Sequence, residues 1–205
     1  MARDTRSIVK MSRREGYALH PKAHKALVKR TNMPGQAPNY RSRTKASQYS
    51  LQLREKQKVK RLYGLLEKQF SNLMKESTRK QGQSGENLLQ FLEQRADNTI
   101  YRAGFAPSRR AARQLVTHGH FLLNGTRVDI PSIRMKAGDK LVLREHSVKS
   151  GYFTQLDEVS PAPSETPGWI KVDRKKVSVE VTGLPARTDA EPDINEQLIV
   201  EYYSR

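Results

Sequence analysis

Apolar residues recur with a helical period after residue 46. In SQYSLQLREKQKVKRLYG, residues 47–64, Leu51, Val59 and Leu62 stand among good helix formers, and Gly64 supplies a stop. The spacing over residues 66–77 predicts a second helix that ends at KQGQSG. Four-residue intervals between apolar positions then predict a single third helix over residues 86–104.

A short amphipathic helix is predicted next. Pro107 and the N-cap residue Ser108 open it, and Gly119 ends it. At about 100° per residue, Leu115 and Val116 fall with two alanines on one arc, and three arginines fall on another. The helix can therefore dock on a core by one side while holding a cluster of guanidinium groups out on the other.

From residue 120 the apolar period changes to two, which predicts strands. Asn124-Gly125 between apolar flanks predicts a two-residue hairpin. SIRM and KLVLR around a KAGD turn predict a second strand pair over residues 132–144, and WIKVDRKKVSVEV predicts a third over 169–181. The closing DINEQLIVEYYSR is ambiguous, because Asn195 can cap a helix and LIVEYY can form a strand.

Residues 1–46 show no sustained periodicity and mix basic residues with prolines. This composition predicts a basic arm that is disordered in the isolated protein. The alternative is an arm that becomes ordered on RNA.

Charge indicates the class of partner. The 205-residue chain has a net charge of +17, distributed as +16 over residues 1–80, +7 over 95–149 and −4 over 150–205. Nucleic acid is the first candidate, since phosphate neutralisation releases counterions. A membrane surface is the weaker candidate, because no basic amphipathic helix with a large apolar face stands out. The C-terminal portion is expected to pack internally or to meet a basic partner.

The sequence gives little support for a membrane-spanning, secreted, metal-binding or enzymatic protein. No apolar run reaches the length of a membrane-spanning helix, and the first ten residues lack the core of a secretory signal. The absence of cysteine excludes disulfides and cysteine-based zinc or redox sites and fits a reducing intracellular compartment. Without a P-loop, dinucleotide fingerprint or nucleophile elbow, we expect neither a cofactor nor an enzyme.

The arginines of the short helix, Arg109, Arg110 and Arg113, are the leading candidates for phosphate contact. None of the three has an acidic residue three or four positions away, so local ion pairing does not account for them. Residues on the following strands extend the basic area: Arg127, Arg134, Lys136 and Lys140. An ordinary solvated helix face is the alternative.

A second basic set lies on the helix over residues 47–64: Arg54, Lys56, Lys58, Lys60 and Arg61. A plain surface helix explains this set as well as phosphate contact does. Tyr40, Tyr49 and Tyr63 could stack on bases, although we favour the core for Tyr63.

Two histidines and one aspartate complete the candidates. His118 and His120 lack the further ligands of a zinc site, so we expect them to contact phosphate or a helix end. Asp97 is expected to be a structural hydrogen-bonding group rather than a general base.

RADNTIYRAGFAPSRRAARQLVTHGHFLLNGTRVDIPSIRMKAGD, starting at Arg95, resembles the RNA-binding module named after ribosomal protein S-four. The resemblance extends over essentially the whole chain through five further segments: SRREG, PGQ, QLREKQKVKRLYG, EKQF and INEQLIVEYYS. The sequence is thereby identified as a member of the bacterial-type small-subunit ribosomal protein S-four family, in a cysteine-free form. Val9 and Ser12 stand where many relatives carry zinc-binding cysteines, so no metal is expected.

The resemblance implies an α+β fold. It consists of a basic N-terminal arm (1–46), a mainly helical discontinuous domain (47–94 plus 186–205) and an inserted RNA-binding module (95–185). The module has paired helices and a small antiparallel or mixed sheet. The resemblance also favours a helix for NEQLIVEYY.

For function, the resemblance implies a structural constituent of the small subunit, in cytoplasmic or organellar ribosomes. It would bind a 5′-domain junction of 16S-type rRNA early in assembly, line the opening through which mRNA enters, and influence accuracy beside ribosomal proteins S-five and S-three. Arg41, Arg43 and Lys45 match the region facing mRNA. The rRNA-binding candidates also include Arg13 and Arg14.

An RNA-modifying enzyme and a free translational regulator are the alternatives to a structural role. An RNA-modifying enzyme using the same module would need a further catalytic domain, and residues 150–205 are too few for one. A free translational regulator that binds its own mRNA is compatible with the ribosomal role.

Overall fold

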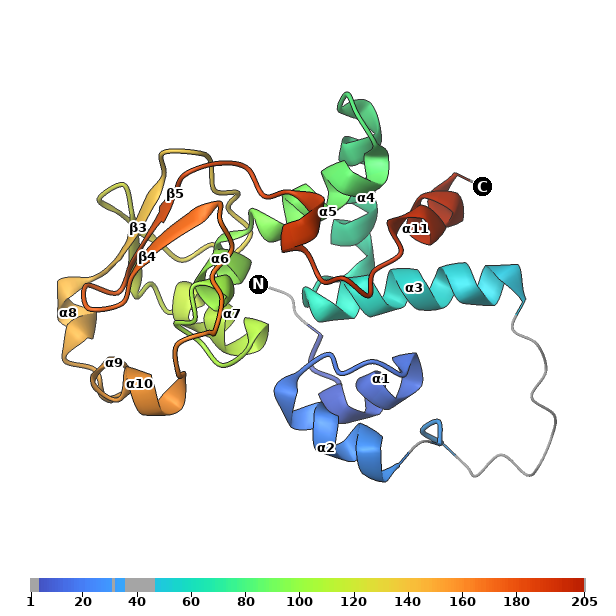
Figure 1. The fold of residues 1–205 in the computed structure, drawn as a ribbon, viewed down its shortest axis with the longest axis horizontal. Coiled ribbons are helices and arrows are strands. Elements are labelled where there is room, and N and C mark those ends of the chain that lie inside the picture. Colours follow the sequence, from blue (N-terminus) through green and yellow to red (C-terminus); the bar gives the residue numbers. More distant parts are fainter. Residues whose placement is uncertain (1–3, 31, 36–46, 205) are drawn as a thin grey trace. The chain divides into compact units, whose positions relative to one another are not determined.

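The computed structural model describes residues 4–30, 32–35 and 47–204 (Figure 1). The chain divides into two compact units. The first comprises the described residues up to Asn87 and those from Asp193 onward, and the second comprises Leu88–Pro192. Helices together with one antiparallel sheet confirm the expected α+β class.

The first unit is helical. Its elements are α1 (Ile8–Glu15), α2 (Pro21–Lys29), α3 (Gln48–Leu62), α4 (Glu67–Arg79), the start of α5 (Ser84–Glu93) and α11 (Glu196–Tyr203). The C-terminal segment is thus a helix, and it lies along α3 (Figure 1). Val59, Phe70 and Ile199 are fully buried, and the prediction that Tyr63 belongs to the core is confirmed.

The expectation of a disordered N-terminal arm is wrong for the residues in α1 and α2. His20 caps α2, because its Nδ1 accepts a hydrogen bond from the Lys22 backbone N–H at 3.0 Å. Met11, Leu19 and Ala23 are buried. Both helices are too short to produce a sustained apolar period in the sequence. They are stabilised by packing on each other and by the packing of α1 on α3.

A carboxylate ties the first unit's helices together. Glu67 accepts hydrogen bonds from Lys56 (2.7 Å), Lys60 (2.8 Å) and the Tyr203 hydroxyl (2.9 Å). Burial alone would raise the pKa of Glu67, but the hydrogen bonds from these three groups lower it to about 2. Burial and the neighbouring Glu67 carboxylate raise the pKa of Tyr203, so its hydroxyl remains a donor at all ordinary pH values.

We expect Glu67 to make the first unit acid-sensitive. Its folded pKa lies below the ordinary 4.5, so its contribution is present above pH 4.5 and is lost as the pH falls toward 2. The side chain is 48% exposed, so we expect only about 1 kcal/mol. Amide hydrogen exchange of α3 and α11 should show wild type and Glu67→Gln converging in stability across this window. A constant difference between them would contradict this assignment.

The second unit carries the sheet. It contains α6 (Ala96–Arg102), α7 (Arg109–Thr117), the short helices α8 (Glu145–Val148), α9 (Gly151–Thr154) and α10 (Leu156–Val159), and the 3-10 helix η1 (Arg187–Asp189). Its strands are β1 (Phe121–Leu123), β2 (Thr126–Val128), β3 (Lys140–Leu143), β4 (Ile170–Asp173) and β5 (Ser178–Val181). Within the described residues they form one five-stranded antiparallel sheet in the order β2-β1-β3-β5-β4. Ile100, Phe105, Phe121 and Leu141 belong to the core that joins this sheet to the helices.

The hairpin prediction is confirmed. Asn124 and Gly125 both have positive φ, 50° and 86°, as a type I′ turn requires. The Asn124 amide donates to Asp139 and accepts from the Lys140 backbone N–H, both at 2.9 Å. The two strands predicted over 169–181 are also confirmed as β4 and β5.

Two predictions of regular structure are wrong. The helix over 86–104 is broken, because Arg95 is extended (φ −64°, ψ 137°) and its side chain turns back onto Asp97. Residues 132–135 form no strand with 140–143; Arg134 makes only an isolated bridge to Arg95. Long-range backbone pairing supplies the reason: the Met135 N–H donates to Gln94 and the Ala96 N–H to Ile133, each at 2.8 Å.

Candidate nucleic-acid interface

Helix α7 is fixed at its start and along one side. The Ser108 hydroxyl caps it by accepting from the Ala111 N–H at 3.2 Å. Ala112, Leu115 and Val116 are buried in the core of the second unit, and α7 packs against α6. The predicted docking of this helix is therefore confirmed.

Two of the three arginines point into ion pairs. Arg109 donates to Asn98 and to Glu191, both at 2.9 Å, and its guanidinium lies 4.6 Å from the Tyr101 ring centre. Arg113 lies 3.4 Å from Asp97. Their side chains are only 12% and 11% exposed, so the expectation that all three would be held out from the core is wrong. Arg110 is exposed, as expected.

A buried carboxylate lies at the centre of this network. Glu93 is fully buried and accepts from Asn98 at 2.7 Å and from Arg102 through two hydrogen bonds at 2.9 Å. Asp97 accepts a two-pronged pair from Arg95 at 3.0 and 2.8 Å, which confirms that it is structural. These ion pairs hold α6 and α7 in a fixed geometry.

Several basic side chains of α7, the hairpin and the loop before β3 are nevertheless exposed. We call this set the hairpin face: Arg110, His118, Arg127, Lys136 and Lys140. Arg127 packs over Gly119, next to His118 at the end of α7, and the Asn124 turn is bonded to Asp139 and Lys140 in the loop that follows Lys136. Arg127, Lys136 and Lys140 form no ion pair with any carboxylate in the described part of the chain. Their charge is thus available to a polyanion.

Gly119 sets the position of Arg127. Its φ is +70°, and an added Cβ would lie 2.4 Å from Arg127 Nε. We expect Gly119→Ala to destabilise the protein by about 1 kcal/mol through backbone strain and also to displace the guanidinium, weakening RNA binding. Gly125→Ala is the matched control, because φ is +86° there and nothing lies within 4 Å. Equal RNA affinity of the two variants in a filter-binding titration would contradict this role of Arg127.

The remaining candidates of this unit are less exposed. His120 contacts Ser147 Oγ at 3.0 Å and packs edge-on against Phe153. Burial, with the nearby charges of His118 and Arg144, lowers the pKa of His120, so it is neutral at pH 7. The Arg134 guanidinium lies 4.3 Å from the Phe91 ring centre.

In the first unit, every basic candidate of the predicted helix is engaged in an ion pair, although five cations share three carboxylates. Arg54 and Arg61 both pair with Glu15, Lys56 and Lys60 pair with Glu67, and Lys58 pairs with Glu55. Burial raises the pKa of Glu15 despite its arginine partners and lowers the pKa of Arg61. Arg13 donates to the Asn32 carbonyl at 2.7 Å, whereas Arg14 is exposed.

Sequence reasoning missed a more accessible basic helix. Lys22, Lys25, Lys29 and Arg30 of α2 and its C-cap are exposed and make no ion pair with a described carboxylate. The signal was present, because residues 16–54 contain neither aspartate nor glutamate. Tyr40, Arg41, Arg43 and Lys45 lie outside the described residues.

Comparison with known sequences identifies the family. Residues 3–93 match the ribosomal protein S4/S9 N-terminal domain, and residues 94–141 match the S4 domain. The chain is 49% identical to the small ribosomal subunit protein uS4 of Pelodictyon phaeoclathratiforme, 48% to that of Chlorobium limicola and 47% to that of Clostridioides difficile, each over 100% of both chains. The chain belongs to the uS4 family. This family consists of structural ribosomal proteins and not of enzymes.

All five residues of the hairpin face lie within the segment that matches the S4 domain. No cysteine occurs in this uS4 family member, and within its described residues no three histidines or carboxylates are grouped as metal ligands. No helix in that part of the chain is long and apolar enough to cross a membrane.

Proposed function

We propose that this chain binds the 5′ domain of small-subunit rRNA before other proteins join the subunit, using the hairpin face as its contact with phosphate. Family membership carries the coarser statement that it is a small-subunit ribosomal protein that binds rRNA. The observation that supports the finer one is that the S4 domain contains the exposed cations Arg127, Lys136 and Lys140, which pair with no carboxylate among the described residues.

A preformed site favours early binding. The buried ion pairs of Glu93 and Asp97 fix α6 and α7, so little ordering is needed when RNA arrives. Such a rigid surface is suited to recognise a folded RNA junction by its shape and phosphate spacing rather than by its base sequence. The purified chain should therefore form a complex with a protein-free 5′-domain fragment in a gel-shift assay. A requirement for another ribosomal protein would contradict early binding.

At the opening through which mRNA enters, we propose that Arg41, Arg43 and Lys45 contact the message. They belong to the stretch without acidic residues, so their charge is not neutralised by close neighbours in sequence. Changing all three to glutamine should slow translation of an mRNA with a stable hairpin and leave an unstructured mRNA unaffected. Equal effects on both messages would contradict the assignment.

We also propose that the chain contacts ribosomal proteins S-five and S-three. Through its contact with S-five it would influence the accuracy of translation. The resemblance of the whole chain supports these contacts, and the net charge of −4 over residues 150–205 suits a basic protein partner. Purified S-five should bind the chain without RNA in a calorimetric titration. Binding only in the presence of rRNA would argue against a direct contact.

A further inference from the structure

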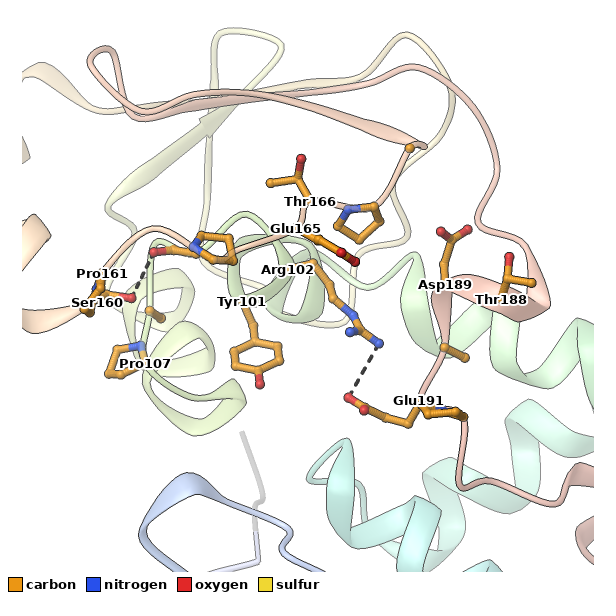
Figure 2. Close-up of a pocket in the computed structure, with 17 residues that line it drawn as sticks. Tyr101, Arg102, Pro107, Ser160, Pro161, Glu165, Thr166, Thr188, Asp189 and Glu191 are labelled. Atoms are coloured by element: carbon orange, nitrogen blue, oxygen red, sulfur yellow. Dashed lines mark hydrogen bonds and ion pairs between the residues drawn. The ribbon is translucent and has the colours of Figure 1, made fainter. Parts of the chain in front are cut away.

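A pocket in the second unit has a character opposite to that of the hairpin face. It has a volume of about 660 Å³, within the range of ligand-binding clefts. Three segments line it: the end of α6, the loop over residues 160–168 and the segment 188–192 that ends η1 (Figure 2). Arg102 and Glu165 reach into the space between them (Figure 2).

The pocket walls are held in place by specific bonds. The Gly104 carbonyl accepts from Ser160 Oγ at 2.9 Å and from Arg174 at 3.2 Å. Arg174 also pairs with Asp157 at 2.7 Å and donates to the Ser160 carbonyl. The ring of Pro163 packs on Gly104 so closely that a Cβ there would lie 2.3 Å from Pro163 Cδ. The loop is thus anchored against α6 and the pocket is preformed.

The charge of the pocket is negative. Arg102 is the single cation among the lining residues and is neutralised by Glu93 and Glu191, at 2.9 and 3.6 Å. Glu165 makes no hydrogen bond or ion pair with any residue that the structure describes. Among the described residues, Asp189 accepts only the Ala186 N–H, at 2.7 Å. Glu165 and Asp189 therefore have no cationic partner among the described residues, while Arg187 donates to the Glu191 carbonyl at 3.4 Å.

The lining residues also carry fewer backbone hydrogen-bond donors than acceptors. Five of the lining residues are prolines, which have no backbone N–H: Pro107, Pro161, Pro163, Pro167 and Pro192. Carbonyl and carboxylate oxygens remain as acceptors. An arginine side chain is the complementary group, since it carries five donors and no acceptor. Phosphate has the opposite requirements and would be repelled by Glu165 and Asp189.

We propose that this pocket docks an arginine-bearing extended segment of a protein partner. The proposal accounts for an acidic, proline-rich pocket in a chain of net charge +17, which rRNA binding does not explain. Glu165 and Asp189 would pair with the guanidinium groups, and the proline rings would pack against the aliphatic stems.

The test uses backbone amide shifts of the full-length protein at 0.15 M salt, which shortens the reach of the overall positive charge. The probe is a capped hexapeptide of alternating arginine and glycine, and hexauridylate serves as the RNA comparison. We expect the peptide to shift the amides of Thr166, Gly168 and Thr188. In Glu165→Gln/Asp189→Asn, binding should weaken by about tenfold.

The control variant is Glu145→Gln/Glu158→Gln, which makes the same change in net charge at exposed positions outside the pocket. It should bind the peptide as wild type does. Asparagine at 189 retains an acceptor for the Ala186 N–H, and unchanged shifts elsewhere verify the fold. Unshifted lining amides, equal weakening in both variants, or shifts caused by hexauridylate instead would each overturn the proposal.

Discussion

Replacing Glu93 with glutamine is expected to lower the free energy of unfolding of the second unit by about 3 kcal/mol. Glu93 is fully buried and accepts from Arg102 and Asn98, with Arg109 at 3.9 Å. Glutamine preserves the volume but removes the charge, and its amide donates where an acceptor is needed. Arg102, 18% exposed, would be left with Glu191 as its more distant partner. Removing one member of a buried pair leaves an uncompensated charge, which is the expensive outcome.

Trp169 makes this loss measurable. It is the single tryptophan of the chain and is 4% exposed in the core of the second unit, so its fluorescence during urea unfolding reports on that unit. Glu145→Gln, an exposed position of the same unit, is the control and should change stability by less than about 0.5 kcal/mol. Equal midpoints for the two variants would contradict the account of the network.

The second large effect is expected from Arg109→Ala/Arg113→Ala. Because these arginines pair with Glu191 and Asp97, their loss should destabilise the second unit by about 2–4 kcal/mol. Affinity for the 5′-domain fragment should fall mainly because α7 loses its fixed position. The salt dependence of binding by the remaining folded protein should then stay close to that of wild type.

Arg110→Ala provides the comparison on the same helix. Arg110 is exposed, so its loss should change stability by less than about 0.5 kcal/mol while lowering affinity and the salt slope. Trp169 fluorescence and RNA titrations over a salt series separate the two effects. A stable double variant with a reduced salt slope would show that Arg109 and Arg113 contact phosphate directly.

Local signals explain which elements could be predicted from the sequence. Asn124-Gly125 specifies a turn by its own backbone preferences, and Ser108 specifies the start of α7 by its own hydroxyl. Gly64 and the apolar spacing before it likewise located α3 to within two residues. Each of these features depends on residues that are close together in the chain.

Elements fixed by distant residues could not be predicted in this way. The break at Arg95 depends on backbone pairing with residues 133–135, about forty positions later. Helices α1 and α2 depend on packing with each other, and α1 also packs on α3, because each is too short to be stable alone. In both cases the local sequence pattern does not determine the secondary structure, because contacts with distant residues do.

The same distinction governs the candidate interface. Sequence located the positive charge, yet it could not show which cations are neutralised by carboxylates inside the fold. Arg109 pairs with a residue 82 positions away, and Arg61 with one 46 positions away. Arg110 and Arg127, by contrast, are exposed on α7 and β2.

The most direct test of the central claim is the salt dependence of binding to a 5′-domain rRNA fragment by Arg110→Gln/Arg127→Gln. With two phosphate contacts removed from the hairpin face, the slope of log K against log salt should decrease by about 1.5 and affinity should fall by about tenfold. Lys171→Gln/Lys175→Gln, with the same change in net charge at exposed positions on and beside β4, should leave both unchanged. If the two double variants lose slope and affinity equally, the protein binds RNA by its overall charge and the hairpin face is not its site.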